Sequence, residues 1–249
     1  MKIINIVLSC VLVLGLATLC GSKGKKVDKE ATTTEQAAAT DGWKVLFDGT
    51  STTGWRGYNK TSFPTEGWEV VDGTLHCIGT GLGEASGRDI IYDQKFSNFE
   101  LSLEWKLSEG GNSGIFILAQ EIPNEPIYKS APEMQILDNV KHIDAQLGVN
   151  GNRQAGSLYD LIPAVPQNTK PVGEWNQVGI LVYQGTVVFK SNGANVLEFH
   201  LWTDDWKKMV LGSKFKDWEW FVNPAKEGYI GLQDHGNDVW FRNIKIKEL

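Results

Sequence analysis

Two short segments of the chain carry polar side chains at alternate positions. Glu133 and Gln135 are separated by one residue, and so are Gln233 and His235. Because successive side chains of a β-strand point to opposite faces, each pair would share a face if its segment were a strand. We expect the two segments to lie side by side, so that these groups open into one hollow. Carboxyl and imidazole groups are well suited to exchanging protons with a substrate.

Further polar residues complete the candidate site. Glu133 and His235 are the candidate catalytic acid and base, in an order that the sequence leaves open. A strand expected next along the chain adds Arg242, whose guanidinium we expect beside His235. The candidates for substrate binding are Asn112, Gln135, Asp138, Tyr159, Gln233 and Arg242. Taken alone, an Asp or Arg near a strand end more often forms a turn or a solvated charge, so the prediction depends on the group.

The same groups leave the question of a metal open. Carboxylate, amide and imidazole groups on one face could hold a hard divalent cation, as a possible cofactor. The sequence has no His and Cys spacing of the zinc-site kind, no Gly-x-Ser-x-Gly motif and no Walker motif. Of the other histidines, His142 falls in an expected loop and could also line the site.

Tryptophan is abundant, with ten residues, and indole rings stack well on sugars. Three fall in alternating strands and are predicted core residues: Trp68, Trp105 and Trp240. Five fall in loops or in a short helix, where they could frame the mouth of a sugar site: Trp55, Trp202, Trp206, Trp218 and Trp220.

Alternating patterns recur along the chain and predict the strands that position these groups. Residues 99–107 are apolar at every odd position and polar at every even one, which indicates a strand with one buried face. Residues 114–118 form a continuous apolar strand that could be covered on both faces. Many strands, without a repeat of fixed period, predict an all-β fold. We expect two packed antiparallel sheets, a jelly-roll sandwich with a concave face.

Turns and one helix are also marked. Residues 68–77 are predicted to form a hairpin whose turn is Asp72-Gly73, a pair that suits positive φ angles. A second hairpin is expected within residues 179–191. Helix is scarce, and the best candidate spans residues 203–212, where a threonine cap and two aspartates precede a terminal glycine.

The N-terminus indicates export. Residues 1–20 have the pattern of a secretory signal, and the cysteine at its end, Cys20, resembles the lipid-attachment site of bacterial lipoproteins. Residues 21–40 are small, polar or charged and are predicted to form a flexible tether. The predicted domain spans residues 41–249. We therefore expect a protein of the periplasm or outer membrane, attached to the membrane by its lipid.

The charge of the chain and its cysteines narrow the predicted partners and covalent bonds. The chain has 24 basic and 30 acidic residues, and a net charge of −6 argues against nucleic acid as a partner. Cys10 lies in the expected signal and Cys20 is the expected lipid site, which leaves Cys77 alone. No internal disulfide is therefore expected.

Several motifs occur in an order that is known from one family. They are Leu46-Phe47-Asp48-Gly49, Trp68-Glu69-Val70-Val71-Asp72-Gly73, Gly111-Asn112-Ser113-Gly114, Glu133-Met134-Gln135-Ile136-Leu137-Asp138, Gly156-Ser157-Leu158-Tyr159, Gly173-Glu174-Trp175-Asn176, Ile230-Gly231-Leu232-Gln233-Asp234-His235-Gly236 and Phe241-Arg242-Asn243-Ile244. From about Trp43 to its end, the chain resembles the 3-keto-disaccharide hydrolase domain. The resemblance implies a concanavalin A-like jelly roll that acts on glycosides whose C3 hydroxyl is already oxidised to a ketone.

Such a substrate implies a particular chemistry. A ketone at C3 acidifies the hydrogen on C2, so a base can remove it, the C1–O bond can break by elimination, and water can then add back. The reaction needs a base, an acid and a group that holds the enolate oxygen. Gln135, Arg242 or a bound cation could hold that oxygen. A positioned base contributes about 10²–10⁴-fold, so loss of Glu133 or His235 should lower turnover at least about 100-fold.

Two other classes of function remain open. A non-catalytic, lectin-like sugar-binding module would bind sugars and yield no product. A conventional glycosidase needs two carboxyl groups about 5–10 Å apart. The candidate second carboxylate is Glu104, on the polar face of its strand, although a solvated surface charge is the more common use of such a residue.

Overall fold

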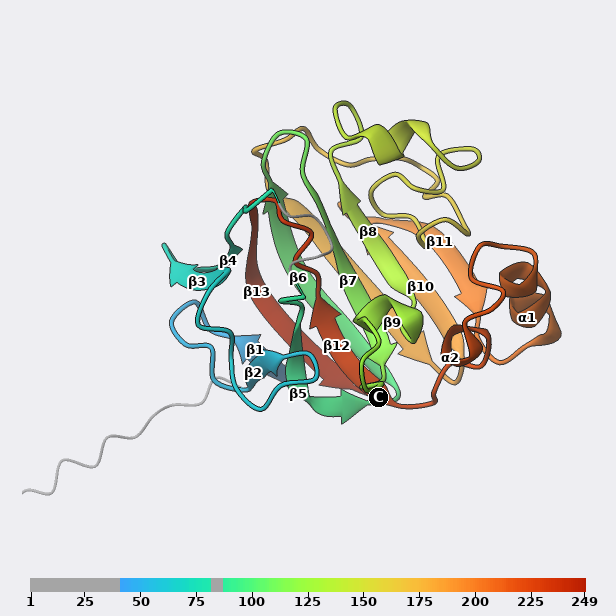
Figure 1. Cartoon of the computed structure of the whole chain (residues 1–249), viewed down its shortest axis with the longest axis horizontal. Helices are drawn as coiled ribbons and strands as arrows, with labels where there is room; N and C mark the ends of the chain where they lie inside the picture. The colour runs from blue at the N-terminus through green and yellow to red at the C-terminus, as the bar shows by residue number, and fades with distance from the viewer. Residues whose placement is uncertain (1–40, 82–86) are drawn as a thin grey trace, which may run out of the picture. The chain divides into compact units, whose positions relative to one another are not determined.

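The computed structural model describes residues 41–81 and 87–249, and these residues form a sandwich of two antiparallel sheets (Figure 1). The expected signal, tether and lipid site lie outside the described residues. The strands are β1 (Trp43–Phe47), β2 (Trp55–Gly57), β3 (Trp68–Val71), β4 (Thr74–Cys77), β5 (Ile90–Phe96), β6 (Phe99–Leu107), β7 (Asn112–Ala119), β8 (Glu133–Leu137), β9 (Asn176–Tyr183), β10 (Thr186–Ser191), β11 (Ala194–His200), β12 (Gly228–Leu232) and β13 (Val239–Glu248).

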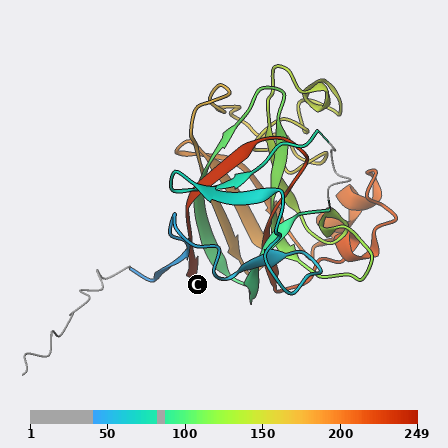
Figure 2. The ribbon, with the colours of Figure 1, turned by 60° about the vertical axis from the view of Figure 1, so that its left-hand side comes forward.

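The eight-stranded sheet has the order β11-β10-β9-β6-β13-β4-β3, with β1 also paired to β13. The five-stranded sheet has the order β2-β5-β12-β7-β8. A second view shows these two sheets as stacked layers (Figure 2). The predicted all-β jelly-roll sandwich is therefore confirmed.

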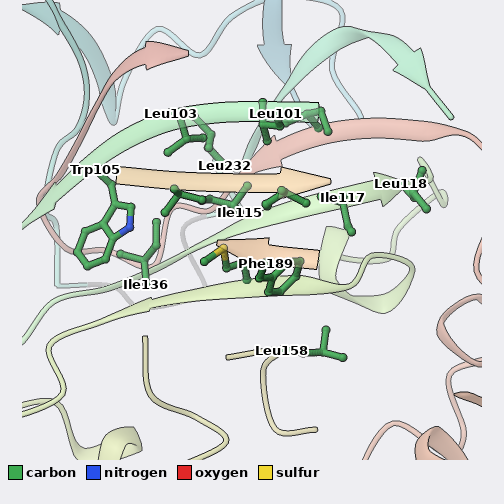
Figure 3. Packing of buried hydrophobic residues seen from close by; sticks show 14 of the residues in the cluster. Leu101, Leu103, Trp105, Ile115, Ile117, Leu118, Ile136, Leu158, Phe189 and Leu232 are labelled. Carbon is green, nitrogen blue, oxygen red and sulfur yellow. The ribbon is translucent and has the colours of Figure 1, made fainter. Parts of the chain in front are cut away.

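The main core fills the space between the layers. Leu101 and Leu103 of β6 face Ile115 and Ile117 of β7, and all four are completely buried (Figure 3). The predicted alternation of residues 99–107 is confirmed, since every odd side chain there is buried and every even one is half-buried. Burial of this apolar surface is the main source of stability, at about 25 cal/mol per Å².

Both predicted hairpins are present. Asp72 and Gly73 join β3 to β4 with φ angles of 49° and 72°, as the turn chemistry requires. Gln184 and Gly185 join β9 to β10 with φ angles of 49° and 88°. Positive φ at both central residues matches the twist of the flanking strands, so these turns fix the strand register.

Helices are few. The predicted helix is α1 (Asp204–Leu211), whose cap Thr203 accepts a hydrogen bond from the backbone N–H of Trp206. A second helix, α2 (Glu219–Val222), was not predicted, since four residues without a side-chain cap give no periodic signal. The described residues also form two 3₁₀ turns, η2 (Ile127–Lys129) and η3 (Ile143–Gln146). Within the described ranges, no helix is both long and apolar enough to cross a bilayer.

The five-stranded sheet positions the polar segments. The two segments flank β7 instead of pairing with each other: β8 pairs with one side of β7 and β12 with the other. The expectation that the two segments lie directly side by side is therefore wrong, because β7 lies between β8 and β12. Phe116 of β7 belongs to a small apolar cluster separate from the main core. The outer face of the sheet, away from the core, therefore carries Phe116, Gly114 and the polar side chains.

Candidate active site

Glu133 stands on the outer face of β8, and its side chain lies over the neighbouring strand. Its register partner is Phe116, and Gly114 is opposite Gln135. A methyl group at Gly114 would lie 2.7 Å from Cδ of Glu133 and would overlap its Oε1. The absence of a side chain at Gly114 therefore makes the space that the carboxyl group occupies. Glu133 is buried, with 7% of its surface exposed.

This carboxyl group lines a cavity of about 240 Å³, which we call the aromatic cavity. The cavity is lined by Tyr128, Ala131, Glu133, Tyr159, Lys214, Phe215, Trp218, Phe221 and Gln233. Its floor is the five-stranded sheet, and its aromatic wall comes from η2 and from the segment around α2. Figure 1 shows α1 and α2 together at one side of the sandwich, beside β11. Aromatic rings of this kind suit the C–H face of a sugar ring.

Gln233 is the second predicted residue in the aromatic cavity. Its backbone N–H donates to the carbonyl of Gly114, which places it across β7 from Glu133. Its side chain is 5% exposed, and its Oε1 has no hydrogen-bond partner among the described residues. A buried acceptor left in this state favours a ligand hydroxyl as its partner.

The aspartate that follows anchors this segment. Asp234 is buried and accepts hydrogen bonds from the backbone N–H of Gly236 and from Nε of Arg88, both at 2.8 Å. Its own N–H donates to the carboxylate of Asp89. These contacts fix the backbone on both sides of Gln233 and His235, so Asp234 positions the segment.

Tyr159 lines the aromatic cavity with its ring. Its hydroxyl donates to Oδ2 of Asp144 at 2.7 Å. Burial, together with this carboxylate, raises the pKa of Tyr159 well above its usual value, so the phenol stays protonated at neutral pH. The position of the Tyr159 ring in the cavity lining is consistent with the prediction that this residue contacts substrate. Its hydroxyl proton is already donated to Asp144.

Lys214 is a cavity residue that the sequence analysis missed. Its Nζ lies 4.2 Å from the centre of the Tyr159 ring and 3.3 Å from Oδ2 of Asp160. Arg153 also pairs with Asp160, at 2.6 Å. Since Lys214 follows a helix in an irregular segment, no periodic signal assigns it to a site. With Lys214 and Glu133 in one lining, the cavity has an ammonium that can stabilise an oxyanion and a carboxylate that can take a proton.

His235 lies beyond Gln233, next to His142. The two imidazole rings meet edge to face with centroids 6.2 Å apart. Burial and the nearby His235 lower the pKa of His142, so that ring is neutral at pH 7. Its Nδ1 accepts from the N–H of Asp144, which leaves its proton on Nε2. His142 therefore lies beside His235, and neither ring lines the aromatic cavity with Glu133.

Three further candidates, Asn112, Gln135 and Asp138, are buried and lie outside the lining of the aromatic cavity. Gln135 accepts a hydrogen bond from the backbone N–H of Ile136 through its Oε1. Asn112 is 4% exposed, and its Oδ1 has no partner in the described part of the chain. The surroundings of Gln135 and Asn112 therefore do not assign a substrate role to either amide.

Asp138 has a structural role. Its carboxylate accepts hydrogen bonds from the backbone N–H groups of Gly110, Val140 and Lys141, at 2.8–3.1 Å. Burial alone would raise the pKa of Asp138, but these donors outweigh it and hold the pKa below the usual value. The carboxylate therefore fixes the loop after β8, and the prediction that it binds substrate in the Glu133 site is not supported by its position.

Arg242 is not part of this site, and the prediction that it lies beside His235 is wrong. It belongs to β13 of the eight-stranded sheet, where its Nε donates to Glu104 at 2.7 Å and its guanidinium stacks on Trp175. The flanking residue Phe241 is buried in the main core. Arg242 and Glu104 therefore face outward on the side of the sandwich opposite Glu133.

A second hollow adjoins the aromatic cavity. It measures about 330 Å³, and we call it the polar hollow. It is lined by Tyr58, Asn59, Lys60, Gly87, Asp89, Asn124, Glu125, Pro126, Tyr128, Gln233 and Asp234. Tyr128 and Gln233 line both spaces, so the two hollows meet at these side chains.

Of the five tryptophans predicted to frame a mouth, Trp218 lines the aromatic cavity. Trp55 and Trp206 are buried in the main core. Trp202 and Trp220 are exposed and lie outside the cavity lining. In the parts of the chain that the structure describes, no group of three His, Cys, Asp or Glu residues could hold a metal ion.

Comparison with known proteins gives consistent results. A model of the 3-keto-alpha-glucoside-1,2-lyase-like domain matches residues 42–247. A 3-keto-disaccharide hydrolase of Bacteroides thetaiotaomicron is 52% identical over 230 residues, covering 84% of this chain and 79% of that protein. A crystal structure of a candidate glycosyl hydrolase from Parabacteroides distasonis is similar with a TM-score of 0.75 and 28% identity, over 84% of this chain and 94% of that one. A second such structure from that organism gives 0.66 and 28%, over 83% and 99%.

Proposed function

Since the chain belongs to the 3-keto-alpha-glucoside-1,2-lyase-like family and is a glycoside-cleaving enzyme, we propose that its substrates carry a ketone at C3 of the ring that is cleaved. One observation carries this proposal. Within the described residues that line the aromatic cavity, Glu133 is the only carboxylate, and it shares the cavity with the ammonium of Lys214. A carboxylate base and a cation that stabilises an oxyanion are the two groups needed to remove a proton from the carbon beside a carbonyl group.

The proposed reaction begins with Glu133 as the base. Its carboxylate takes the proton from C2, and the electron pair moves into an enolate on the C3 oxygen. Lys214 faces that oxygen and stabilises its negative charge. The enolate then collapses to the ketone, a double bond forms between C1 and C2, and the C1–O bond breaks. The leaving oxygen takes a proton, and His235, two residues beyond Gln233 of the cavity lining, is our candidate to donate it.

Water completes a net hydrolysis. Its hydroxyl adds to C1, its other proton goes to the group that protonated the leaving oxygen, and C2 regains a proton from the Glu133 carboxyl, which restores the carboxylate. No oxidant or reductant is consumed, because the ketone is present in both substrate and product. If the second step were absent, the protein would release the unsaturated ketone and would act as a lyase.

The two alternatives are less well supported. A conventional glycosidase would pair Glu133 with a carboxylate about 5–10 Å away. The candidate for that partner, Glu104, is held by Arg242 on the opposite side of the sandwich. A lectin-like module does not require the buried carboxylate of Glu133, which fits in place only because residue 114 is glycine.

The test of this function compares a 3-keto-glucoside with its unoxidised parent. We expect release of the leaving group from the keto substrate alone, with products identified by NMR spectroscopy. The reaction is repeated with a chelator to reveal any dependence on a cation. Cleavage of the parent at a comparable rate would favour the conventional glycosidase, and binding of both compounds without any product would favour the lectin-like module.

Lys214 provides a separate prediction. Replacing Lys214 with Met should lower kcat on a 3-keto-glucoside by at least about tenfold. An enclosed oxyanion donor is worth about 10²–10³-fold, and partial exposure reduces the effect. Asp160 keeps its ion pair with Arg153, so the fold should be retained. The measurement is steady-state kinetics, with thermal unfolding as a check of stability.

Lys190 is the matched control. Its Nζ lies 3.4 Å from Glu100 and its side chain is 41% exposed, against 3.3 Å and 39% for Lys214. Lys190 lies on β10 of the other sheet. Lys190→Met should leave kcat unchanged, and an equal loss in both variants would remove Lys214 from the mechanism.

A further inference from the structure

Two contacts hold the ammonium of Lys214 in the lining of the aromatic cavity. Its Nζ lies 3.3 Å from Oδ2 of Asp160 and 4.2 Å from the centre of the Tyr159 ring. The Lys214 side chain is 39% exposed, so without such contacts this long side chain would sample many rotamers in solvent. The position of the ammonium therefore depends on how firmly Asp160 and Tyr159 are themselves held.

Arg153 fixes the carboxylate of the first contact. Its Nε donates to Oδ1 of Asp160 at 2.6 Å, and its Nη2 donates to Oδ2 at 3.3 Å. A planar guanidinium that binds a carboxylate at two points fixes its orientation as well as its distance. The backbone N–H of Asp160 also donates to the carbonyl of Asn152 at 2.8 Å. The oxygen that faces Lys214 is thus held in place by Arg153.

Arg153 also fixes the ring of the second contact, through Asp144. Its Nη1 donates to Oδ1 of Asp144 at 2.8 Å, and Oδ2 of that carboxylate accepts from the hydroxyl of Tyr159 at 2.7 Å. Burial would raise the pKa of Asp144, but hydrogen bonds from Arg153 and Tyr159 hold it below its usual value, so this carboxyl group is charged at neutral pH. The backbone N–H of Tyr159 donates to the carbonyl of Glu133. The ring beneath Lys214 is therefore held at both ends.

We propose that Arg153 is a positioning residue for the reaction, because its guanidinium fixes both groups that hold the Lys214 ammonium. The inference rests on the proposed function for the task of Lys214, which is to stabilise the enolate oxygen. Arg153 lies outside the lining of the aromatic cavity, so it acts through Lys214. Displacement of a catalytic group by about 1 Å can cost about 10²-fold in rate. Loss of Arg153 should thus slow the reaction although the cavity lining keeps all its side chains.

Arg56 provides a matched control elsewhere in the fold. Its guanidinium also joins two carboxylates, that of Asp93 at 2.7 Å and that of Glu121 at 2.5 Å, and lies 5.2 Å from the centre of the Tyr229 ring. The side chains of Arg56 and Arg153 are 12% and 20% exposed. Arg56 also lies outside the lining of the aromatic cavity. Replacing either arginine leaves two carboxylates without their shared partner, so the losses of stability should be similar and only the kinetic effects should differ.

The first experiment measures kcat and KM on a 3-keto-glucoside. Arg153→Met should lower kcat by at least about fivefold, and by no more than Lys214→Met does. In the double variant of Arg153→Met with Lys214→Met, the loss should be close to that of Lys214→Met alone, because Arg153 acts through that ammonium. Arg56→Met should leave kcat unchanged. Additive losses, a normal kcat in Arg153→Met or an equal loss in Arg56→Met would overturn the proposal.

Asp160→Asn provides a second variant in case Arg153→Met does not fold. Asp160 has a φ of 58°, a conformation that Asn tolerates better than most residues, and the amide has nearly the shape of the carboxylate. The variant keeps the pair of Arg153 with Asp144 but removes the negative charge that holds Lys214. It should lower kcat at least about threefold, and the loss should disappear when Lys214 is already Met. A normal kcat in Asp160→Asn would contradict the route through this carboxylate.

A structural comparison separates this inference from the proposed function, because it requires no turnover. Crystal structures of the Arg153→Met and Arg56→Met variants should show the Lys214 ammonium displaced from the Tyr159 ring, beyond the 4.2 Å of the wild-type contact, in the first variant alone. An ammonium that keeps its place in Arg153→Met would overturn the inference even if 3-keto-glucosides were cleaved. Displacement in a protein that cleaves no 3-keto-glucoside would support the link from Arg153 to Lys214 and contradict the proposed reaction instead.

Discussion

Glu133→Gln should lower kcat on a 3-keto-glycoside by at least about 100-fold, because the amide cannot accept the C2 proton and a positioned base is worth about 10²–10⁴-fold. The amide has nearly the shape of the carboxyl group, so the stability of the fold should change little. The measurement is product formation, together with exchange of the C2 hydrogen for deuterium in heavy water. Exchange reports on the base directly, and it should fall in parallel with kcat.

Glu104→Gln is the matched control for this variant. Glu104 also lies in a strand and is half-buried, but it pairs with Arg242 on the other side of the sandwich. Its replacement should leave kcat and C2 exchange unchanged. A large loss in Glu104→Gln, with cleavage of unoxidised glycosides, would revive the conventional glycosidase. Normal C2 exchange in Glu133→Gln would remove Glu133 from the role of base.

Gly114→Ala should lower kcat by an amount close to that of Glu133→Gln, although no functional group is lost. The added methyl group would overlap Oε1 of Glu133 and lie 2.7 Å from its Cδ, so the carboxyl group must move away. The displaced atoms form the end of a flexible side chain, and the φ of Gly114 is not positive. The temperature of unfolding should therefore change much less than the rate.

Gly179→Ala and a double variant complete this test. Gly179 is a strand glycine of β9 whose added methyl group would lie 3.3 Å from the flexible side chain of Lys190. Gly179→Ala should leave kcat unchanged. In the double variant of Gly114→Ala with Glu133→Gln, the losses should not add, because both act through one carboxyl group. Full additivity would show that Gly114 acts by another route.

The sequence predicted the architecture well because strand patterns are local. The strict alternation of residues 99–107 and the Asp72-Gly73 turn each follow from contacts between near neighbours. The same reasoning placed Glu133 and Gln233 on the polar faces of their segments, and both line one cavity. Alternation fixes the face of a strand on which a side chain stands, and this was sufficient for those two residues.

Contacts that depend on which sheet a strand joins could not be predicted in this way. Arg242 follows His235 by seven residues, yet the chain passes from the five-stranded to the eight-stranded sheet between them. Lys214 and Trp218 line the same cavity as Glu133, although they belong to an irregular segment more than 80 positions away in the sequence. Asp138 shares a motif with Glu133, but its hydrogen bond from Gly110 joins residues 28 positions apart and so depends on the tertiary fold.

Three aromatic residues of the cavity wall, Phe215, Trp218 and Phe221, belong to the connection between β11 and β12, which passes from one sheet to the other and contains α1 and α2. No ladder of paired strands dictates the length or composition of such a connection. Relatives can therefore acquire a new wall by insertion or exchange of residues there, while the pairing that holds Glu133 over Gly114 is inherited intact. Substrate preference and proton transfer can thus evolve at different rates within one fold.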